Sequence, residues 1–206
     1  MPANLIEKLW KRGKDFLGVD YPILGGAMSW ISESNLVSAI SNGGGFGVLA
    51  GGNMPVELFK AEIDKTFDKT DKPFGVNLIS IAPNFRNHLD YVLESDFPFV
   101  IFAGGLPPRD AISKAKQAGC KVLCFAPTVG IAERLIKSGV DALIIEGHEA
   151  GGHIGPVSTA VLAEQILPNT RDVPVFVAGG IGTGLMMVHY LLMGASGVQL
   201  GTKFAE

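Results

Sequence analysis

Two histidines in the stretch HEAGGH, residues 148–153, are the first candidates for chemistry in this sequence. Zinc peptidases use H-E-x-x-H, in which the histidines are four residues apart and share one face of a helix. His148 and His153 are five residues apart, which is about 140° around a helix of 3.6 residues per turn. Gly151 and Gly152 also disfavour a helix, by about 1 kcal/mol each relative to alanine. We therefore predict no metal site.

The stretch fits better as the end of a buried strand that continues into a glycine-rich loop. Histidine exchanges a proton near neutral pH, so His153 is a candidate general acid or base in that loop. The simpler alternative is a loop histidine bonded to backbone carbonyls; the position after a strand favours the first interpretation. His148 is nearer the strand end, and His88 and His189 fall in helical stretches, where we expect surface or packing roles.

Eight short apolar runs must position these residues. Their nearly continuous Val, Ile, Leu and Phe content is typical of parallel strands buried on both faces. Helical stretches separate the runs, and a strand–helix unit repeated eight times predicts a closed (β/α)8 TIM barrel. The sequence stops directly after the eighth run, so we expect a truncated chain that lacks the eighth helix and the C-terminal segment. The runs span residues 21–28, 46–52, 74–79, 99–105, 121–127, 142–152, 173–180 and 197–205.

Start and stop signals mark the helices between the runs. Thr128 can cap the start of one helix and Gly139 can end it in a left-handed conformation. Pro108 and Gly119 bound the preceding helix in the same way. Residues 1–20 predict a short amphipathic helix, and the barrel domain then spans residues 21–206.

The composition suits one globular domain, because 47% of the 206 residues are hydrophobic and 18% are charged. The net charge of −3, with scattered basic residues, argues against a nucleic-acid partner. No apolar run approaches the roughly 20 residues that span a membrane, and the N-terminus lacks the apolar core of a signal peptide. Cys120 and Cys124 lack redox or metal spacing, so we expect reduced thiols in a cytoplasmic protein.

Glycine pairs follow five of the runs on their carboxyl side, where a TIM barrel carries its active site. We expect about half of these glycines to serve turns only, and the others to let a ligand approach the backbone. After the seventh and eighth runs, the glycines precede a helix start near Thr183 and the pair Gly201-Thr202, which predicts a site for a phosphate group. The spacing does not satisfy the dinucleotide pattern G-x-G-x-x-G. The pairs are 25–26, 51–52, 104–105, 151–152 and 179–180.

Asn77 and Glu146 are polar residues within apolar runs, where an unpaired polar group is costly. Each fits either a hydrogen bond to a polar cofactor or a bond to neighbouring backbone. Met28 follows a glycine pair and fits an apolar wall or a contact with a flat ring. Glu149, Ser158 and Thr159 fit loop and capping positions, and together they add no chemistry of their own.

Six strings, in their order and spacing, resemble the nitronate monooxygenase family, formerly called 2-nitropropane dioxygenases. That family includes flavin-dependent enoyl-acyl-carrier-protein reductases. The strings cover nearly the whole chain and read PILGGAMSWIS, GGGFGVLAGGN, KPFGVNLI, EGHEAGGHIG, FVAGGI and GVQLGTKF. The resemblance implies FMN at the mouth of the barrel and places the family's catalytic histidine at His153. It implies FMN contacts at Met28, Asn77, Glu146, Gly151, Gly152, Gly179, Gly180, Gln199, Leu200, Gly201 and Thr202.

The resemblance implies a small-molecule substrate and two possible activities, and the glycines after the seventh and eighth runs leave a third open. The first is an FMN-dependent monooxygenase that oxidises alkyl nitronates or nitroalkanes with O2 to a carbonyl compound and nitrite, with His153 as base. The second is an enoyl reductase that uses FMN and NAD(P)H; Glu146, where many nitronate monooxygenases have glutamine, is nearer this branch. The third is a barrel that binds a phosphorylated ligand without redox chemistry. We also leave a homodimer open.

Overall fold

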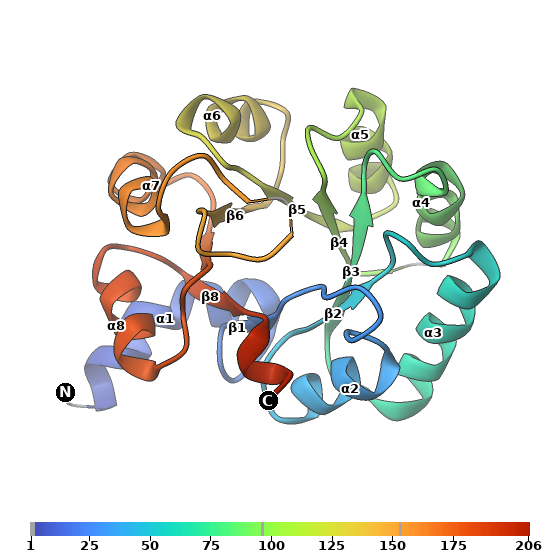
Figure 1. Cartoon of the computed structure of the whole chain (residues 1–206), viewed down its shortest axis with the longest axis horizontal. Coiled ribbons are helices and arrows are strands. Elements are labelled where there is room, and N and C mark those ends of the chain that lie inside the picture. The colour runs from blue at the N-terminus through green and yellow to red at the C-terminus, as the bar shows by residue number, and fades with distance from the viewer. Residues whose placement is uncertain (1–2, 96, 153) are drawn as a thin grey trace.

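The eight apolar runs form the parallel strands of a barrel. The structure is a computed structural model that describes residues 3–95, 97–152 and 154–206, and its strands alternate with helices along the chain (Figure 1). The strands are β1 (Ile23–Gly25), β2 (Gly47–Ala50), β3 (Phe74–Ile79), β4 (Phe99–Ala103), β5 (Lys121–Phe125), β6 (Ala142–Glu146), β7 (Val175–Ala178) and β8 (Gly197–Leu200).

Helices surround this ring of strands. None of the described helices combines the length and the apolar character that a membrane span requires. The α-helices are α1 (Ala3–Leu17), α2 (Ser34–Asn42), α3 (Val56–Lys69), α4 (Phe85–Glu94), α5 (Arg109–Gln117), α6 (Val129–Lys137), α7 (Thr159–Ile166) and α8 (Gly184–Leu192), and the 3-10 helices are η1 (Leu167–Asn169) and η2 (Thr202–Phe204).

The first strand closes the sheet. The strand order is β1-β8-β7-β6-β5-β4-β3-β2, and every neighbouring pair is parallel. At the remaining junction a bridge joins Leu24 to Phe46, where the Gly25 amide donates to the Phe46 carbonyl at 2.9 Å and the Phe46 amide donates to the Ile23 carbonyl at 2.9 Å. The (β/α)8 TIM barrel predicted from the sequence is confirmed, and α8 follows β7 while η2 follows β8.

The strands are apolar throughout because they bury both faces. On β4, Ile101 faces the barrel interior, while its neighbours Val100 and Phe102 pack against the helices. This alternation gives two cores, one inside the barrel and one between strands and helices. Among the large residues of the interior core, those at most 1% exposed include Leu24, Phe46, Ile101, Leu123 and Phe176.

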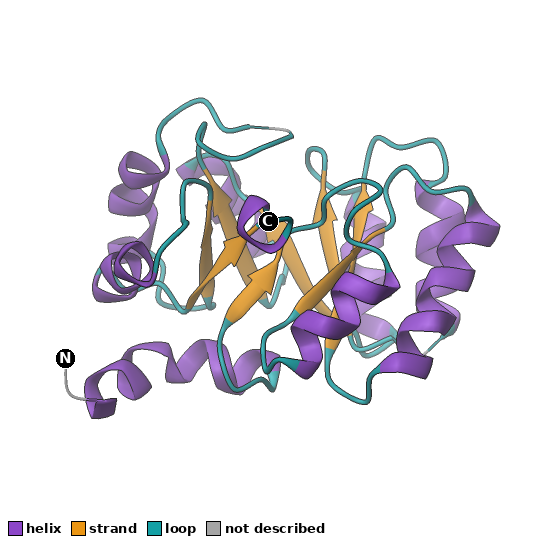
Figure 2. Cartoon of the chain, turned by 60° about the horizontal axis from the view of Figure 1, so that its bottom comes forward, coloured by secondary structure: helices purple, strands orange, loops and turns teal. Residues whose placement is uncertain are grey.

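Helix α1 closes the amino-terminal end of the barrel. Figure 2 shows α1 beneath the strands, at the end opposite their arrowheads. Leu17 is 1% exposed and belongs to the interior core. The ring of Phe16 lies 6.0 Å from that of Phe99 and 6.2 Å from that of Phe176. Lys121 Nζ donates to the Phe16 carbonyl at 2.6 Å. These contacts fill the lower end, so the functional end must be the opposite one.

The strands end earlier than the predicted runs. β6 stops at Glu146 within the run 142–152, and β8 stops at Leu200 within the run 197–205. The glycines beyond the strands explain part of the difference; Gly179, for example, has φ +100°, which is incompatible with a strand. Sequence propensity alone did not separate these loops from the strands that they extend.

The predicted helix signals are confirmed. Thr128 accepts a hydrogen bond from the Ile131 amide at 3.3 Å, at the start of α6. Gly139, just beyond the end of this helix, has φ +85°, and Gly119 has the same value after α5. Thr183 caps α8 through the Met186 amide at 3.3 Å.

Replacing Leu17 with Ala should lower the free energy of unfolding by about 2–5 kcal/mol, because it leaves a cavity in the interior core. Urea denaturation followed by circular dichroism measures this loss. Lys8→Ala, at an exposed position of the same helix, should change stability by less than about 0.5 kcal/mol. A similarly small loss for Leu17→Ala would contradict the role of α1 in closing the barrel.

Candidate functional site

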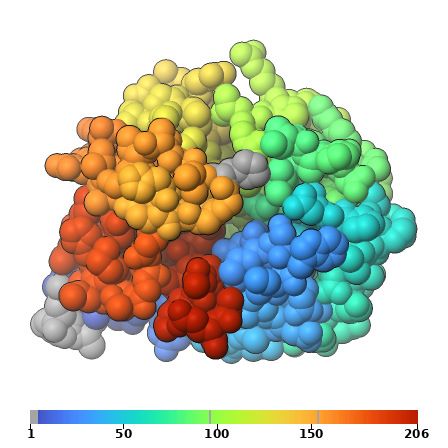
Figure 3. Space-filling model, viewed as in Figure 1, coloured from blue at the N-terminus to red at the C-terminus, as the bar shows by residue number. Residues whose placement is uncertain are grey.

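A cavity of about 980 Å³ opens at the carboxyl ends of the strands. Sites for cofactors and small molecules have about this size. In the space-filling view the C-terminal residues lie beside the segment after β1 (Figure 3). There the Gly26 amide donates to the Leu200 carbonyl at 2.7 Å. The closure between β1 and β8 therefore also builds one wall of this cavity.

Every residue that the family resemblance assigns to FMN lines this one cavity. They come from the loop after β1, from β3, from β6 and its loop, from the loop after β7, and from β8 and its loop. His153, the predicted catalytic residue, lies outside the described residues. The residues brought together are Met28, Asn77, Glu146, Gly151, Gly152, Gly179, Gly180, Gln199, Leu200, Gly201 and Thr202.

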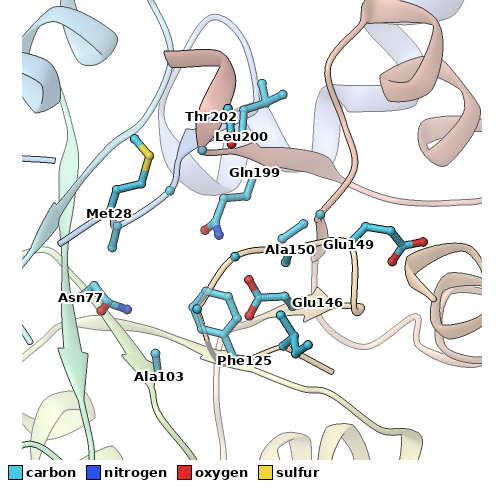
Figure 4. A pocket seen from close by; sticks show the side chains of 18 of the residues that line it. Met28, Asn77, Ala103, Phe125, Glu146, Glu149, Ala150, Gln199, Leu200 and Thr202 are labelled. Atoms are coloured by element: carbon cyan, nitrogen blue, oxygen red, sulfur yellow. The ribbon is translucent and has the colours of Figure 1, made fainter. Parts of the chain in front are cut away.

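Three polar side chains point into the cavity from three different strands. Figure 4 shows Asn77 of β3, Glu146 of β6 and Gln199 of β8 directed toward its centre. Asn77 is 5% exposed, and its Nδ2 donates to the Ile101 carbonyl over a long 3.5 Å. Within the described ranges, no hydrogen bond joins the carboxyl of Glu146 or the side-chain amide of Gln199 to another residue. Such groups are normally paired, so their spare donors and acceptors fit a polar ligand.

Glu146 is the one of these three groups that can ionise. Burial raises the pKa of its carboxyl to about 7, because the charged form loses contact with water. The ring of Phe125 lies near this carboxyl in Figure 4 and contributes an apolar neighbour. Near neutral pH a protonated fraction of Glu146 can therefore donate a hydrogen bond into the cavity, which a carboxylate cannot do.

The turn after β7 requires glycine. Gly179 and Gly180 have φ +100° and +70°. A Cβ on Gly179 would lie 2.9 Å from the Ala150 amide nitrogen and 3.0 Å from Thr159 Oγ1. The lack of side chains lets the loop after β6 pack against this turn, and it leaves backbone exposed to the cavity. The start of α8 lies just beyond this turn. Exposed backbone beside a helix N-terminus favours the binding of an anion.

Glu149 has a structural role although it also lines the cavity. Its carboxylate accepts hydrogen bonds from the Thr159 amide at 2.7 Å and from Thr159 Oγ1 at 2.8 Å. Burial opposes ionisation, but these hydrogen bonds outweigh it and lower the pKa of Glu149. In Figure 4 the carboxylate points away from Asn77, Glu146 and Gln199. Ser158 caps α7 through the Val161 amide at 3.3 Å, so the predicted capping roles are confirmed.

The glycine pairs divide into ligand-facing and packing positions. Seven of the ten glycines line the cavity, and Gly25, Gly51 and Gly52 do not. A Cβ on Gly51 would lie 2.4 Å from the ring of Phe59. A Cβ on Gly52 would lie 2.2 Å from Ile79 of β3, so this pair is required by packing against α3 and β3. The cavity draws on more of the glycines than the expected half.

One side of the cavity is apolar, and it was not predicted from the sequence. We call it the apolar wall; it consists of Ile79, Leu106, Phe125, Pro127, Ile131 and Ile154. The alternation along β5 was a usable signal, because Leu123 faces the interior and Phe125, two residues later, must face the same side. Loop residues such as Leu106 carry no comparable periodicity.

The other singled-out residues lie away from the cavity. His88 is 1% exposed and stacks on Phe59 with ring centroids 4.2 Å apart, which confirms a packing role. Burial lowers its pKa. Cys120 and Cys124 are buried and are not joined in a disulfide, and burial raises the pKa of the Cys124 thiol. Among the described residues, which exclude His153, no group of three His, Cys, Asp or Glu side chains could hold a metal ion.

Fold and site together define a class of protein. It is a (β/α)8 barrel whose strand ends enclose a small-molecule cavity, with unpaired amide and carboxyl groups on one side of a glycine-rich turn. Comparison with known proteins narrows this class. The family model described as nitronate monooxygenase matches residues 11–91 and 78–205. The chain belongs to the nitronate monooxygenase family.

Proteins that are similar to this chain in sequence are named for different activities. A (3aS,4S,5R,7aS)-5-hydroxy-7a-methyl-1-oxo-octahydro-1H-indene-4-carboxyl-CoA dehydrogenase of Rhodococcus jostii is 36% identical over 193 residues, which are 92% of this chain and 53% of that protein. A probable nitronate monooxygenase of Staphylococcus aureus is 28% identical in an alignment 243 residues long, which covers 95% of this chain and 68% of that protein. The chain thus spans about half the length of the first of these curated relatives.

Solved structures share the fold closely. FabK from Thermotoga maritima superposes with a TM-score of 0.90 at 37% identity, over 94% of this chain and 62% of that one. Nitroalkane oxidase from Streptomyces ansochromogenes gives a TM-score of 0.87 at 28% identity, over 93% of this chain and 67% of that one. Both similarities extend over nearly the whole of this chain.

Replacing Glu146 with Gln should stabilise the ligand-free protein at pH 8 and have a much smaller effect at pH 5. The folded carboxyl ionises near pH 7 and the unfolded one from its ordinary value of 4.5, so the cost of burying the charge builds up between these values. Since one pKa unit corresponds to about 1.4 kcal/mol, the gain at pH 8 is on the order of 3 kcal/mol.

Urea denaturation at the two pH values measures this difference. Glu133→Gln, at an exposed position of α6, is the matched control and should have little effect at either pH. An equal gain for Glu146→Gln at both pH values would show that ionisation of this carboxyl is not the cause.

Proposed function

We propose that this chain is the FMN-binding barrel of a flavin-dependent oxidoreductase of the nitronate monooxygenase type. The observation that carries the proposal is the convergence of Asn77, Glu146 and Gln199 on one cavity beside the glycine turns after β7 and β8. FMN has a flat heteroaromatic ring and a phosphate tail. The ring needs hydrogen-bonding side chains, and the phosphate needs the exposed backbone of the glycine turns. When bound, FMN supplies the redox chemistry that protein side chains lack.

The residues fit the two ends of FMN separately. Asn77, Glu146 and Gln199 offer amide and carboxyl groups to the polar edge of the ring. The backbone at Gly179-Gly180 and at Gly201-Thr202 would hold the phosphate, with the start of α8 adding a favourable dipole. Met28 lies close to Gly201, since its Sδ is 3.6 Å from the position of a Cβ there, and would cover the ring from the side of β1.

The chain's own contribution to nitroalkane oxidation is proton transfer and positioning. His153 would remove the α-proton of a neutral nitroalkane, whereas a preformed nitronate needs no such step. The apolar wall would keep water from the reacting carbon. With O2 as co-reactant, the products are a carbonyl compound and nitrite. The family model and the similarity to nitroalkane oxidase support this activity.

A second candidate is an enoyl reductase that uses NAD(P)H. Its support is Glu146, which can donate a hydrogen bond when protonated, and the higher identity to FabK, 37% against 28% for nitroalkane oxidase. The relative named for a carboxyl-CoA substrate also favours a thioester. In this case the substrate is a 2-enoyl thioester, and NAD(P)H enters the cavity as the reductant.

Anaerobic flavin reduction distinguishes these activities. The protein loaded with FMN should bleach near 450 nm on addition of propyl nitronate without NAD(P)H if the first proposal is right. Bleaching by NAD(P)H, followed by reoxidation with butenoyl thioester, would support the reductase instead. Failure of the protein to take up FMN would leave a barrel that binds a phosphorylated ligand without redox chemistry, and would overturn both proposals.

His153→Ala tests the proposed base. The variant should lose at least about 100-fold in kcat/KM for neutral nitroethane, the usual size of a general-base contribution, and much less for ethyl nitronate. Steady-state oxygen consumption measures both reactions. His148→Ala, at an exposed position of the same loop, is the matched control. Equal losses on the two substrates would contradict the assignment of His153 as base.

A further inference from the structure

The cavity has two chemically different halves. Between residues 77 and 131 it is lined by nine residues of the described chain, and Asn77 is the one with a polar side chain. The charged residues that line it all come from the other half, from the end of β6 onward: Glu146, Glu149, Lys203 and Glu206. The adjacency of β3, β4 and β5 in the sheet makes the apolar half continuous. Ile154, from the loop after β6, is the member of the apolar wall that lies outside this range.

Part of the apolar wall is exposed to solvent. Leu106 is 41% exposed and Ile154 is 56% exposed, although both line a concave cavity. Binding of a ligand that covers exposed apolar side chains in a concave site is favourable, because apolar surface is removed from water. A Cβ on Gly105, next to Leu106, would have no atom within 4 Å, so this part of the wall has space in front of it.

Ile131 shows the direction in which the cavity extends. It is the third residue of α6, which lies outside the ring of strands, yet its side chain lines the cavity together with Phe125 and Pro127. The cavity therefore continues from the strand ends outward over the start of α6. A ligand that occupied this branch would be elongated and would leave the polar half free.

We propose that the apolar wall binds a hydrocarbon chain or ring attached to the reacting group of the substrate, so that the protein prefers elongated apolar substrates over short ones. The inference rests on the proposed function, because it assigns Asn77 and the polar half to FMN. It deepens that function by naming the substrate class: a nitronate or enoyl thioester whose apolar part extends past Phe125 and Ile131.

Chain-length dependence tests the proposal. The FMN-loaded protein is assayed with propyl and octyl nitronate, and with butenoyl and dodecenoyl N-acetylcysteamine thioesters plus NADPH. In whichever class is turned over, the longer substrate should have a kcat/KM at least about 10-fold higher, because additional methylene groups leave water. Equal values for long and short substrates would overturn the inference.

Variants locate the effect. Leu106→Asp and Ile131→Ala should each reduce the ratio of kcat/KM for the long substrate to kcat/KM for the short one by roughly 5-fold. Leu185→Asp makes the same change as Leu106→Asp at a leucine on α8 that is 79% exposed and does not line the cavity, and it should leave the preference intact. An unchanged preference in Leu106→Asp and Ile131→Ala would also overturn the inference.

Two binding measurements separate this inference from the proposed function. Flavin absorbance gives the affinity for FMN, which the variants should retain. Titration with dodecanoyl N-acetylcysteamine, a saturated thioester that binds without turnover, should perturb that absorbance, with a Kd raised about 5-fold in Ile131→Ala. If FMN does not bind, the proposed function fails. If FMN binds and short substrates react without any effect of chain length, the apolar-wall inference alone fails.

Discussion

The pairing of β1 with β8, completed by the bridge between Leu24 and Phe46, is the constraint on which the rest of the structure depends. Eight parallel strands with apolar side chains on both faces need an interior and an exterior shell, and closure provides both. Closure also brings all eight carboxyl ends to one rim. Residues as distant in sequence as Met28, Asn77 and Gln199 meet in one cavity for that reason.

The site gives up local stability that the surrounding core must offset. Asn77 lies within β3 and Glu146 ends β6, at positions where an apolar residue would pack without the cost of removing a polar group from water. The interior core directly below them is fully packed, with Leu24, Leu123 and Phe176 at 0% exposure. The rim can therefore keep unpaired hydrogen-bonding groups available to a ligand, because the strands that carry them are fixed from beneath.

Strand number, direction and helix boundaries followed from the sequence, because they depend on local signals such as the caps at Thr128 and Thr183. The family resemblance supplied the cavity residues, and all of the described ones converge in space. The apolar wall could not be predicted from the sequence, because Leu106 and Ile154 lie in loops whose direction depends on tertiary packing. Gly51 was ambiguous for the same reason: only its contact with Phe59 separates a packing glycine from a ligand-facing one.

The closed lower end has a kinetic consequence. Leu17 and Phe16 fill the barrel beneath the strands, so molecules cannot pass through it from one end to the other. Whatever reaches the strand ends must enter and depart on the side of Asn77 and Glu146. Two reactants that need the same place above those residues must then take turns, the first leaving before the second arrives. An order of events would then follow from sharing this rim, because α1 seals the opposite end of the barrel.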